Sequence, residues 1–375
     1  MEAVRPFQSL AHLSARRIAP QHTFRPLCQC LHTSSQRPAT PLPHPTTPGP
    51  PPEPPTPAAS QAEDRVARKR KQAELLRKAQ EIRTNPTKPK TVLQKRFWKD
   101  VTVKDTPDGL QVFLDSRPVR TPSKNILTIP STKHQLATAI ALEWDLLVSV
   151  HQALKTHYIP MTSLAARALD IQNADAQGKT NTREEIIKML MRHLNTDTLL
   201  CWAPEKNIHD APQLEHREGS DSLRKLQIRV AQPIIAYLTT NVWPGVEIKP
   251  ILEPDSILPV PQPEMTKDVI RGWLSSLPAF ELAGLERAVL AGKSLLVGVR
   301  LLVEWSEEFA LLRGDTEEGK RFGIEEAAEA CSLEVRWQTG MWGEVEDTHD
   351  VEKEDVRRQL GSVIILVSGN TQQGM

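Results

Sequence analysis

The chain has 375 residues, with 47 lysines and arginines against 46 aspartates and glutamates. A formal net charge of +1 argues against a dedicated nucleic-acid binder, because such proteins usually have a large basic excess. Four cysteines in a chain of this length do not make a disulfide framework, so we expect reduced thiols at Cys201 and Cys331 in the folded part.

Residues 1–35 have the composition of a mitochondrial presequence. Four arginines provide positive charge in this segment, and Glu2 is the only acidic residue before Glu53. Apolar residues at helical spacing give the segment one hydrophobic face, as import signals require. We predict a removed presequence and a location in the mitochondrial matrix, with a merely disordered basic N-terminus as the alternative.

The segment 36–95 is predicted to lie outside the folded core. Eleven prolines fall within 38–57, a density that excludes helix and sheet and favours an extended linker. Residues 63–83 then predict a charged helix with a thin apolar stripe. Its basic run at 68–71 suggests either contact with RNA or an ordinary solvated helix face.

The block that follows predicts a small antiparallel sheet. Alternating apolar and polar residues indicate a first strand near 97–103 and a second at 110–115. The Asp-Gly turn at 108–109 between them is a strong hairpin signal. Proline is expected to set the next corner at 117–118, and a third short strand follows at 126–129.

A helix is expected to pack on this sheet. Ser131 is suited to cap it, because a serine hydroxyl can accept a hydrogen bond from a free N–H of the first turn. Its apolar side contains these residues: Leu136, Ile140, Trp144, Leu147 and Val148. The indole of Trp144 is predicted to be buried, with Glu143 and Asp145 on either side of it.

A helical bundle is predicted for residues 181–370, with one helix at 293–309 and another at 324–337 among its members. Pro233 interrupts one helical segment, so a kink or a restart is expected there. No run reaches about 18 uncharged apolar residues, because Lys293 and Arg300 interrupt the best candidate, and we predict no membrane span. The predicted fold class is therefore α+β, with a sheet-and-helix domain at 96–180 followed by the all-helical bundle.

The folded part contains no familiar catalytic motif. The stretch 291–294 resembles a phosphate-binding loop, but that loop needs a glycine where this chain has Arg287. Gly-x-Ser-x-Gly, His-Glu-x-x-His and Cys-x-x-Cys are all missing there. His349, Asp350 and Glu352 have metal-ligating side chains, yet such residues in an acidic tail are typically solvated. We predict no catalytic activity, no cofactor and no metal.

Acidic residues beside tryptophan are the remaining candidates, as a surface that binds a partner. A polar loop bracketed by glycines follows Trp337, and polar loops on rigid scaffolds often have functional roles. The candidate residues are Trp342, Glu344, Glu346, Asp347, Glu143 and Asp145. Two alternatives stay open: the tryptophans are buried between the last helices, or Glu344 or Glu143 is the acid of a matrix enzyme.

Five stretches have distinctive sequences: RFW at 96–98, G-x-x-V-x-L-D-x-R-P-V-x-T-P at 109–122, EWD at 143–145, TDTLL at 196–200 and WGEVED at 342–347. In this order they resemble one family, the mitochondrial F1-ATPase assembly chaperones that bind the alpha subunit. The N-terminal motifs are specific, whereas the helical middle is weakly marked.

That resemblance implies a matrix chaperone without catalytic activity, which binds the free F1 alpha subunit until the beta subunit joins. An unassembled subunit exposes apolar interface, and such surface promotes aggregation unless it is covered. The resemblance also implies an N-terminal α+β domain followed by an orthogonal helical bundle. We expect a monomer when free and no nucleic-acid partner. The alternatives are the matrix enzyme and an RNA-associated protein that uses residues 68–71.

Overall fold

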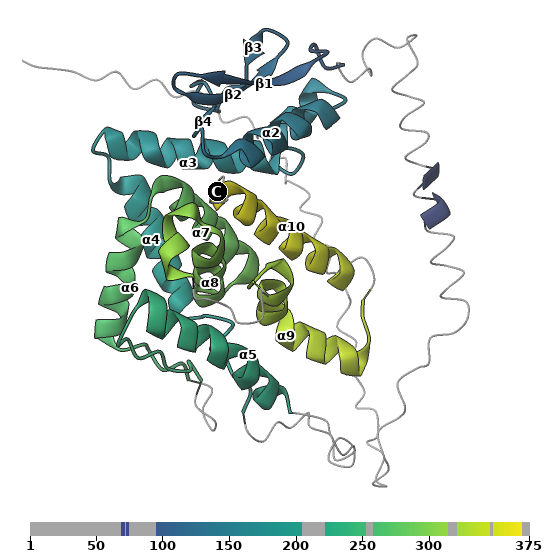
Figure 1. Cartoon of the computed structure of the whole chain (residues 1–375). Helices are drawn as coiled ribbons and strands as arrows, with labels where there is room; N and C mark the ends of the chain where they lie inside the picture. Colours follow the sequence, from purple (N-terminus) through teal and green to yellow (C-terminus); the bar gives the residue numbers. More distant parts are fainter. Residues whose placement is uncertain are drawn as a thin grey trace, which may run out of the picture. The chain divides into compact units, whose positions relative to one another are not determined.

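The computed structural model describes residues 69–71, 73–74, 95–204, 222–252, 258–313, 321–345 and 348–369 (Figure 1). The predicted presequence, the proline-rich linker, Glu346 and Asp347 lie outside these ranges. The chain divides into two units, Met1–Gln72 and Ala73–Met375. Where it is described, the charged helix predicted at 63–83 is helical. Every element named below belongs to the second unit.

An antiparallel sheet begins the described chain after residue 95 (Figure 1). Its strands are β1 (Val101–Thr106), β2 (Gly109–Leu114), β3 (Arg117–Pro118) and β4 (Thr128–Ile129). β2 is central and pairs with the other three strands. Gly109 closes the β1–β2 hairpin with a φ of +131°, and a Cβ there would lie 2.4 Å from the carbonyl oxygen of Ile129. Only glycine fits this position, so the predicted Asp-Gly hairpin is confirmed.

The corner after β2 differs from the prediction. The chain turns at Asp115 and Ser116, whereas 117–118 pairs with β2 as a short strand. Asp115 adopts a φ of 54°, and its carboxylate accepts hydrogen bonds from the backbone N–H groups of Lys99 (3.0 Å) and Asp100 (2.9 Å). These bonds tie the turn to the chain just before β1, and aspartate tolerates the positive φ that the turn needs, so the proline is not required to set it.

The helix α2 (His134–Leu146) packs on β1 and β2. It begins later than the serine cap predicts: Lys133 is the N-cap residue, and no side chain caps the first turn. Leu136 and Ile140 are buried as predicted, but Trp144 is only half-buried. Val148 lies beyond the end of α2 and is exposed, so its predicted place on the apolar side is wrong.

The other helices follow in chain order. They are η1 (Val150–Leu154), α3 (Pro160–Ala176), α4 (Asn181–Leu194), α5 (Leu223–Tyr237), η2 (Leu238–Val242), α6 (Glu264–Ser276), α7 (Ala279–Gly292), α8 (Leu295–Trp305), η3 (Glu307–Leu312), α9 (Ile324–Trp342) and α10 (His349–Val367). α3 packs against both α2 and α7, so it joins the sheet to the helices (Figure 1). The predicted class, a small antiparallel sheet followed by helices, is confirmed. The domain limits at 96–180 and 181–370 stay a prediction.

α8 lies at the centre of the helical part. Every residue from Leu295 to Glu304 is buried, and α4, α5, α7, α9 and α10 all contact this helix. α7 and α10 approach closely at Gly284, where a Cβ would lie 2.9 Å from Cγ1 of Val367. None of the described helices combines the length and the apolar character needed to cross a membrane.

Three helix boundaries differ from the sequence prediction. The single helix expected over 293–309 is broken at Ser306, whose hydroxyl accepts the N–H of Glu308 (3.2 Å) and so starts η3. α5 continues through Pro233 and ends in the π-helical η2. α9 reaches Trp342, five residues further than predicted, so this tryptophan ends a helix and does not lie in a loop.

Candidate partner-binding site

The end of α9 and the start of α10 form an exposed corner. Trp342 is 65% exposed, and Gly343 ends the helix with a φ of +90°. The corner is held by a reciprocal pair of hydrogen bonds: the N–H of Val345 to Nδ1 of His349 (3.0 Å), and the N–H of His349 to the carbonyl of Val345 (3.2 Å). Glu344 lies between Gly343 and Val345 and is exposed. The described residues of this corner therefore present apolar and acidic side chains next to a helix end.

Glu143 lies on the inner side of α2. Its carboxylate accepts the backbone N–H groups of Met161 (2.5 Å) and Thr162 (2.9 Å) and the hydroxyl of Thr162 (2.9 Å). Those groups form the first turn of α3, where Pro160 leaves no N–H to satisfy. Burial raises the pKa of Glu143, and these three hydrogen bonds oppose the rise. This carboxylate caps α3, which leaves it little capacity for a partner.

Asp145 lies two residues further along α2 and is exposed. Its carboxylate pairs with Nη1 of Arg96 (3.3 Å), and its backbone carbonyl accepts from the same nitrogen (2.5 Å). Residues two apart on a helix point in different directions. The structure therefore does not bring Glu143 and Asp145 together, and neither lies in the Trp342 corner.

Trp144 links the segment before β1 to the start of α3. Its Nε1 donates to the hydroxyl of Thr162 (3.0 Å), and its carbonyl accepts from Nε1 of Trp98 (3.3 Å). The two indoles meet edge to face, with their centroids 5.5 Å apart. The EWD stretch thus holds the sheet, α2 and α3 in place. These contacts explain why a carboxylate, an indole and a second carboxylate follow one another at 143–145.

The TDTLL stretch has a similar structural role. Asp197 is fully buried, and its carboxylate accepts the N–H groups of Leu199 and Leu296, both at 3.0 Å. The second bond caps α8 from outside that helix. Burial raises the pKa of Asp197 to about 6, and the hydrogen bonds that it accepts oppose the rise.

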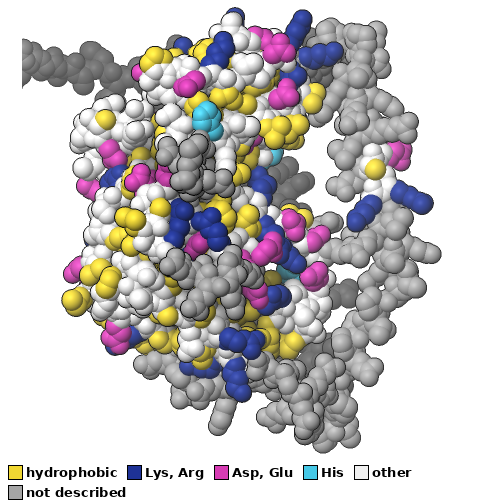
Figure 2. Space-filling model, in the orientation of Figure 1, with side chains coloured by type: hydrophobic (Ala, Val, Ile, Leu, Met, Phe, Trp, Pro, Cys, Tyr) yellow, Lys and Arg dark blue, Asp and Glu magenta, His cyan; other side chains and the backbone are white. Residues whose placement is uncertain are grey.

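An exposed apolar surface on α2 and η1 was missed by the sequence reasoning. Leu142 and Leu146 lie one turn apart on α2 and are exposed, and Val148 and Leu154 continue the apolar surface along the chain. Figure 2 shows hydrophobic side chains interspersed with charged ones in this region. The i, i+4 spacing of the two leucines was the available signal.

A metal-binding cluster or a reactive thiol would be an alternative kind of functional site in the described ranges. No group of three His, Cys, Asp or Glu side chains there is arranged to hold a metal ion. Cys201 and Cys331 are free thiols, and burial raises the pKa of both. A raised pKa keeps a thiol protonated and unreactive.

Residues 95–239 match the family model described as "ATP12 chaperone protein". Protein atp12, mitochondrial, from Schizosaccharomyces pombe is 32% identical over 272 residues, which cover 72% of this chain and 81% of that protein. Protein ATP12, mitochondrial, from Saccharomyces cerevisiae is 32% identical over 286 residues, covering 72% and 82%. The family model is described as a chaperone and not as an enzyme.

The fold agrees with that match. The crystal structure of Atp12 from Paracoccus denitrificans superimposes with a TM-score of 0.52 at 23% identity, covering 73% of this chain and 97% of that one. It therefore has the same sheet-then-helices architecture. The family resemblance seen in the sequence motifs is confirmed: the chain belongs to the ATP12 chaperone family.

Proposed function

We propose that this protein is a mitochondrial matrix chaperone that binds the unassembled alpha subunit of the F1 ATP synthase sector. ATP12 chaperones act in the assembly of that sector, and both fungal relatives are named as mitochondrial. In this proposal the protein covers the subunit interface of alpha until beta takes its place. Covering such a surface requires only complementary contacts, because no covalent bond changes.

The Trp342 corner is the observation that supports this proposal best. An indole that is 65% exposed on an ordered helix end is costly in water and suits the centre of a protein interface. Exposed Glu344 beside it would favour a partner patch with basic residues. The proposed contact set is Trp342 and Glu344 with Glu346, Asp347 and Asp145, whereas Glu143 contributes by fixing α2 to α3.

Capture from mitochondrial extract tests the proposal. The tagged chain should recover the alpha subunit in preference to beta, and recovery of neither, or of both equally, contradicts it. Glu344→Lys should weaken binding to isolated alpha subunit about tenfold while leaving the thermal midpoint nearly unchanged. The matched control is Glu185→Lys, the same charge reversal on exposed α4, which should bind as the wild type does. If Glu344→Lys unfolds the protein, the assignment of this corner as an interface is wrong.

A further inference from the structure

A groove lies between α5 and α9. Two adjoining cavities form it, one of about 360 Å³ and one of about 130 Å³, and Val230 lines both. Pro233 and Tyr237 of α5 face the first cavity with Phe322, whereas Gln227 faces the second. The C-terminal part of α5 and the N-terminal part of α9 line the larger cavity, and the opposite parts line the smaller one, so the two helices run antiparallel. We call this surface the α5–α9 groove.

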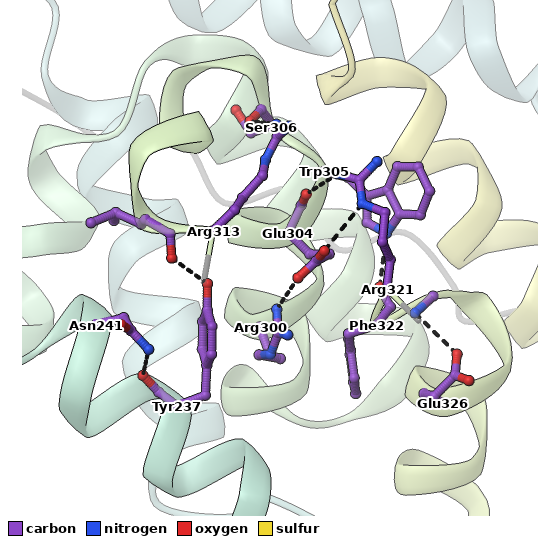
Figure 3. A network of polar contacts seen from close by, with 12 residues as sticks. Tyr237, Asn241, Arg300, Glu304, Trp305, Ser306, Arg313, Arg321, Phe322 and Glu326 are labelled. Atoms are coloured by element: carbon purple, nitrogen blue, oxygen red, sulfur yellow. Dashed lines mark hydrogen bonds and ion pairs between the residues drawn. The ribbon is translucent and has the colours of Figure 1, made fainter. Parts of the chain in front are cut away.

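Arg300 of α8 lines the larger cavity from below. Its guanidinium lies between the rings of Tyr237 (3.7 Å to the centroid) and Phe322 (5.0 Å), as Figure 3 shows. Its side chain is only 11% exposed, and its Nη1 bonds to Glu304 (2.7 Å). Within the described ranges this is the only hydrogen bond of the Arg300 side chain. Its other N–H groups are therefore available to an acceptor that enters the cavity.

Glu304 is held in place by a second arginine. Its second carboxylate oxygen accepts Nε of Arg321 (3.1 Å), and its backbone carbonyl accepts Nη2 of the same arginine (2.7 Å) (Figure 3). Arg321 in turn lies over the ring of Trp305 at 4.1 Å. This network fixes Arg300 at the base of the groove, so the donor is preorganised for a ligand.

The α9 rim of the groove is acidic. Glu326, Glu329 and Glu334 line the cavities, and the last two are exposed. Glu329 pairs with Arg336 (2.6 Å), but both side chains are about half-exposed, so this pair is weak. The facing residues of α5 are uncharged, as Val230 and Pro233 show. A basic side chain is therefore attracted to this rim, whereas a phosphate or a carboxylate is repelled.

These features fit an extended peptide. An aliphatic side chain would fill the larger cavity, a main-chain carbonyl would accept from Arg300, and a basic side chain would lie along the glutamates. Eight residues of α9 separate Glu326 from Glu334, about 12 Å at 1.5 Å per residue, with a kink at the non-helical residue Ser332 between them. Three or four residues of extended chain span about that length, at 3.3 Å each. Beyond the kink at Ser332, α9 continues to Trp342, so the corner lies at the far end of the element that forms the groove wall.

We propose that the α5–α9 groove binds an extended segment of the client F1 subunit in which an aliphatic residue is followed by a lysine or arginine. This inference rests on the proposed chaperone function. It adds a second contact, chemically distinct from the Trp342 corner, and it specifies the sequence type that the groove selects.

Site-specific photo-crosslinking tests the groove directly. p-Benzoylphenylalanine replaces Val335, an exposed residue that lines the smaller cavity, in the full chain mixed with isolated alpha subunit. The control places the same photo-crosslinker at Lys188, exposed on α4. We expect a crosslink from position 335 and none from 188, with mass spectrometry finding an aliphatic–basic peptide of alpha. Co-purification of alpha without this crosslink overturns the groove but not the chaperone function, whereas absence of alpha from the capture overturns the function.

Charge reversal provides an independent measurement. Glu329→Lys combined with Glu334→Lys should weaken binding of alpha about tenfold. The control pair Asp105→Lys and Glu185→Lys makes the same total change of charge at exposed sites outside the groove, and should alter affinity less than twofold. Equal losses for both pairs would indicate general electrostatics and contradict the groove. A crosslink from position 335 to a second copy of this chain would contradict it as well.

Discussion

Buried carboxylates in this protein cap helices to which they do not belong. Glu143 on α2 satisfies the first turn of α3, and Asp197 satisfies the first turn of α8. The free N–H groups of a helix start also form its positive dipole end, so a carboxylate is favoured there on two grounds. Burial opposes this by penalising the charge, which is why the pKa of each carboxyl is raised.

The raised pKa of Asp197 predicts a pH dependence of stability. Its pKa is about 6 in the folded chain, against 3.8 as the ordinary value. Between these values the folded state holds a proton that the unfolded state has lost, so stability falls as pH rises. The difference between these two pKa values corresponds to about 3 kcal/mol of folding free energy. Urea unfolding of wild type and Asp197→Asn from pH 4 to 7 should show the wild type losing about that much relative to the variant. A constant difference would contradict the assignment.

At the scale of elements, local signals predicted which segments are helices and strands but not where they end. The Asp-Gly hairpin and the core side of α2 followed from the alternation of residues and from glycine chemistry. The start of α2 and the break at Ser306 did not, because each depends on a contact distant in sequence. The side chain of Lys133 donates a hydrogen bond to the carbonyl of Val367 (3.0 Å), and the Ser306 hydroxyl donates one to Glu281 (2.9 Å). The periodicity of apolar residues reports only local structure, so it cannot predict such contacts.

Two helix glycines should respond oppositely to alanine. Gly284→Ala places a methyl group 2.9 Å from Val367 at the α7–α10 contact, and the overpacking should cost about 1–3 kcal/mol despite the better helix propensity. Gly272→Ala in α6 meets nothing within 4 Å, so it should stabilise by about 0.5–1 kcal/mol. Urea midpoints of the two variants would measure the difference. Stabilisation by both would show that α7 and α10 do not pack this closely.

At the scale of the whole molecule, the sequence predicted which kinds of residue the candidate site contains better than where those residues lie. Trp342 and Glu344 are exposed as an interface requires, but Glu143 was chosen from its place beside a tryptophan and lies inward. The α5–α9 groove was not predicted. Its floor comes from α8, its walls come from α5 and α9, and Arg300 appeared in the sequence only as a charge that interrupts an apolar run. A site assembled from three helices becomes visible only when their packing is known.

A buried lysine joins the sheet to the helices. Lys133 is buried at the start of α2, and its Nζ bonds to the carbonyl of Val367 (3.0 Å) and to Glu307 (2.8 Å). Lys133→Met keeps the aliphatic stem but leaves the carbonyl of Val367 unpaired and removes the ion pair with Glu307, which among the described residues keeps only the hydroxyl of Thr132 (3.1 Å). The substitution should therefore cost about 2–3 kcal/mol. Lys155→Met, at an exposed position, should cost less than about 0.5 kcal/mol.

The shape of the unfolding curve would show what this joint does. If Lys133 couples the sheet to the helices, tryptophan fluorescence and circular dichroism should report coincident transitions in wild type and separate ones in Lys133→Met. Two of the eight tryptophans, Trp98 and Trp144, lie in the sheet-and-α2 part, so its separate unfolding would add a partial fluorescence change that circular dichroism, dominated by the helices, would show only weakly. Coincident curves at an unchanged midpoint in the variant would mean that packing of α3 on α7 alone unites the two parts. In that case the Lys133–Glu307 ion pair would have no measurable role in keeping the sheet fixed relative to the helices that form the groove and the corner.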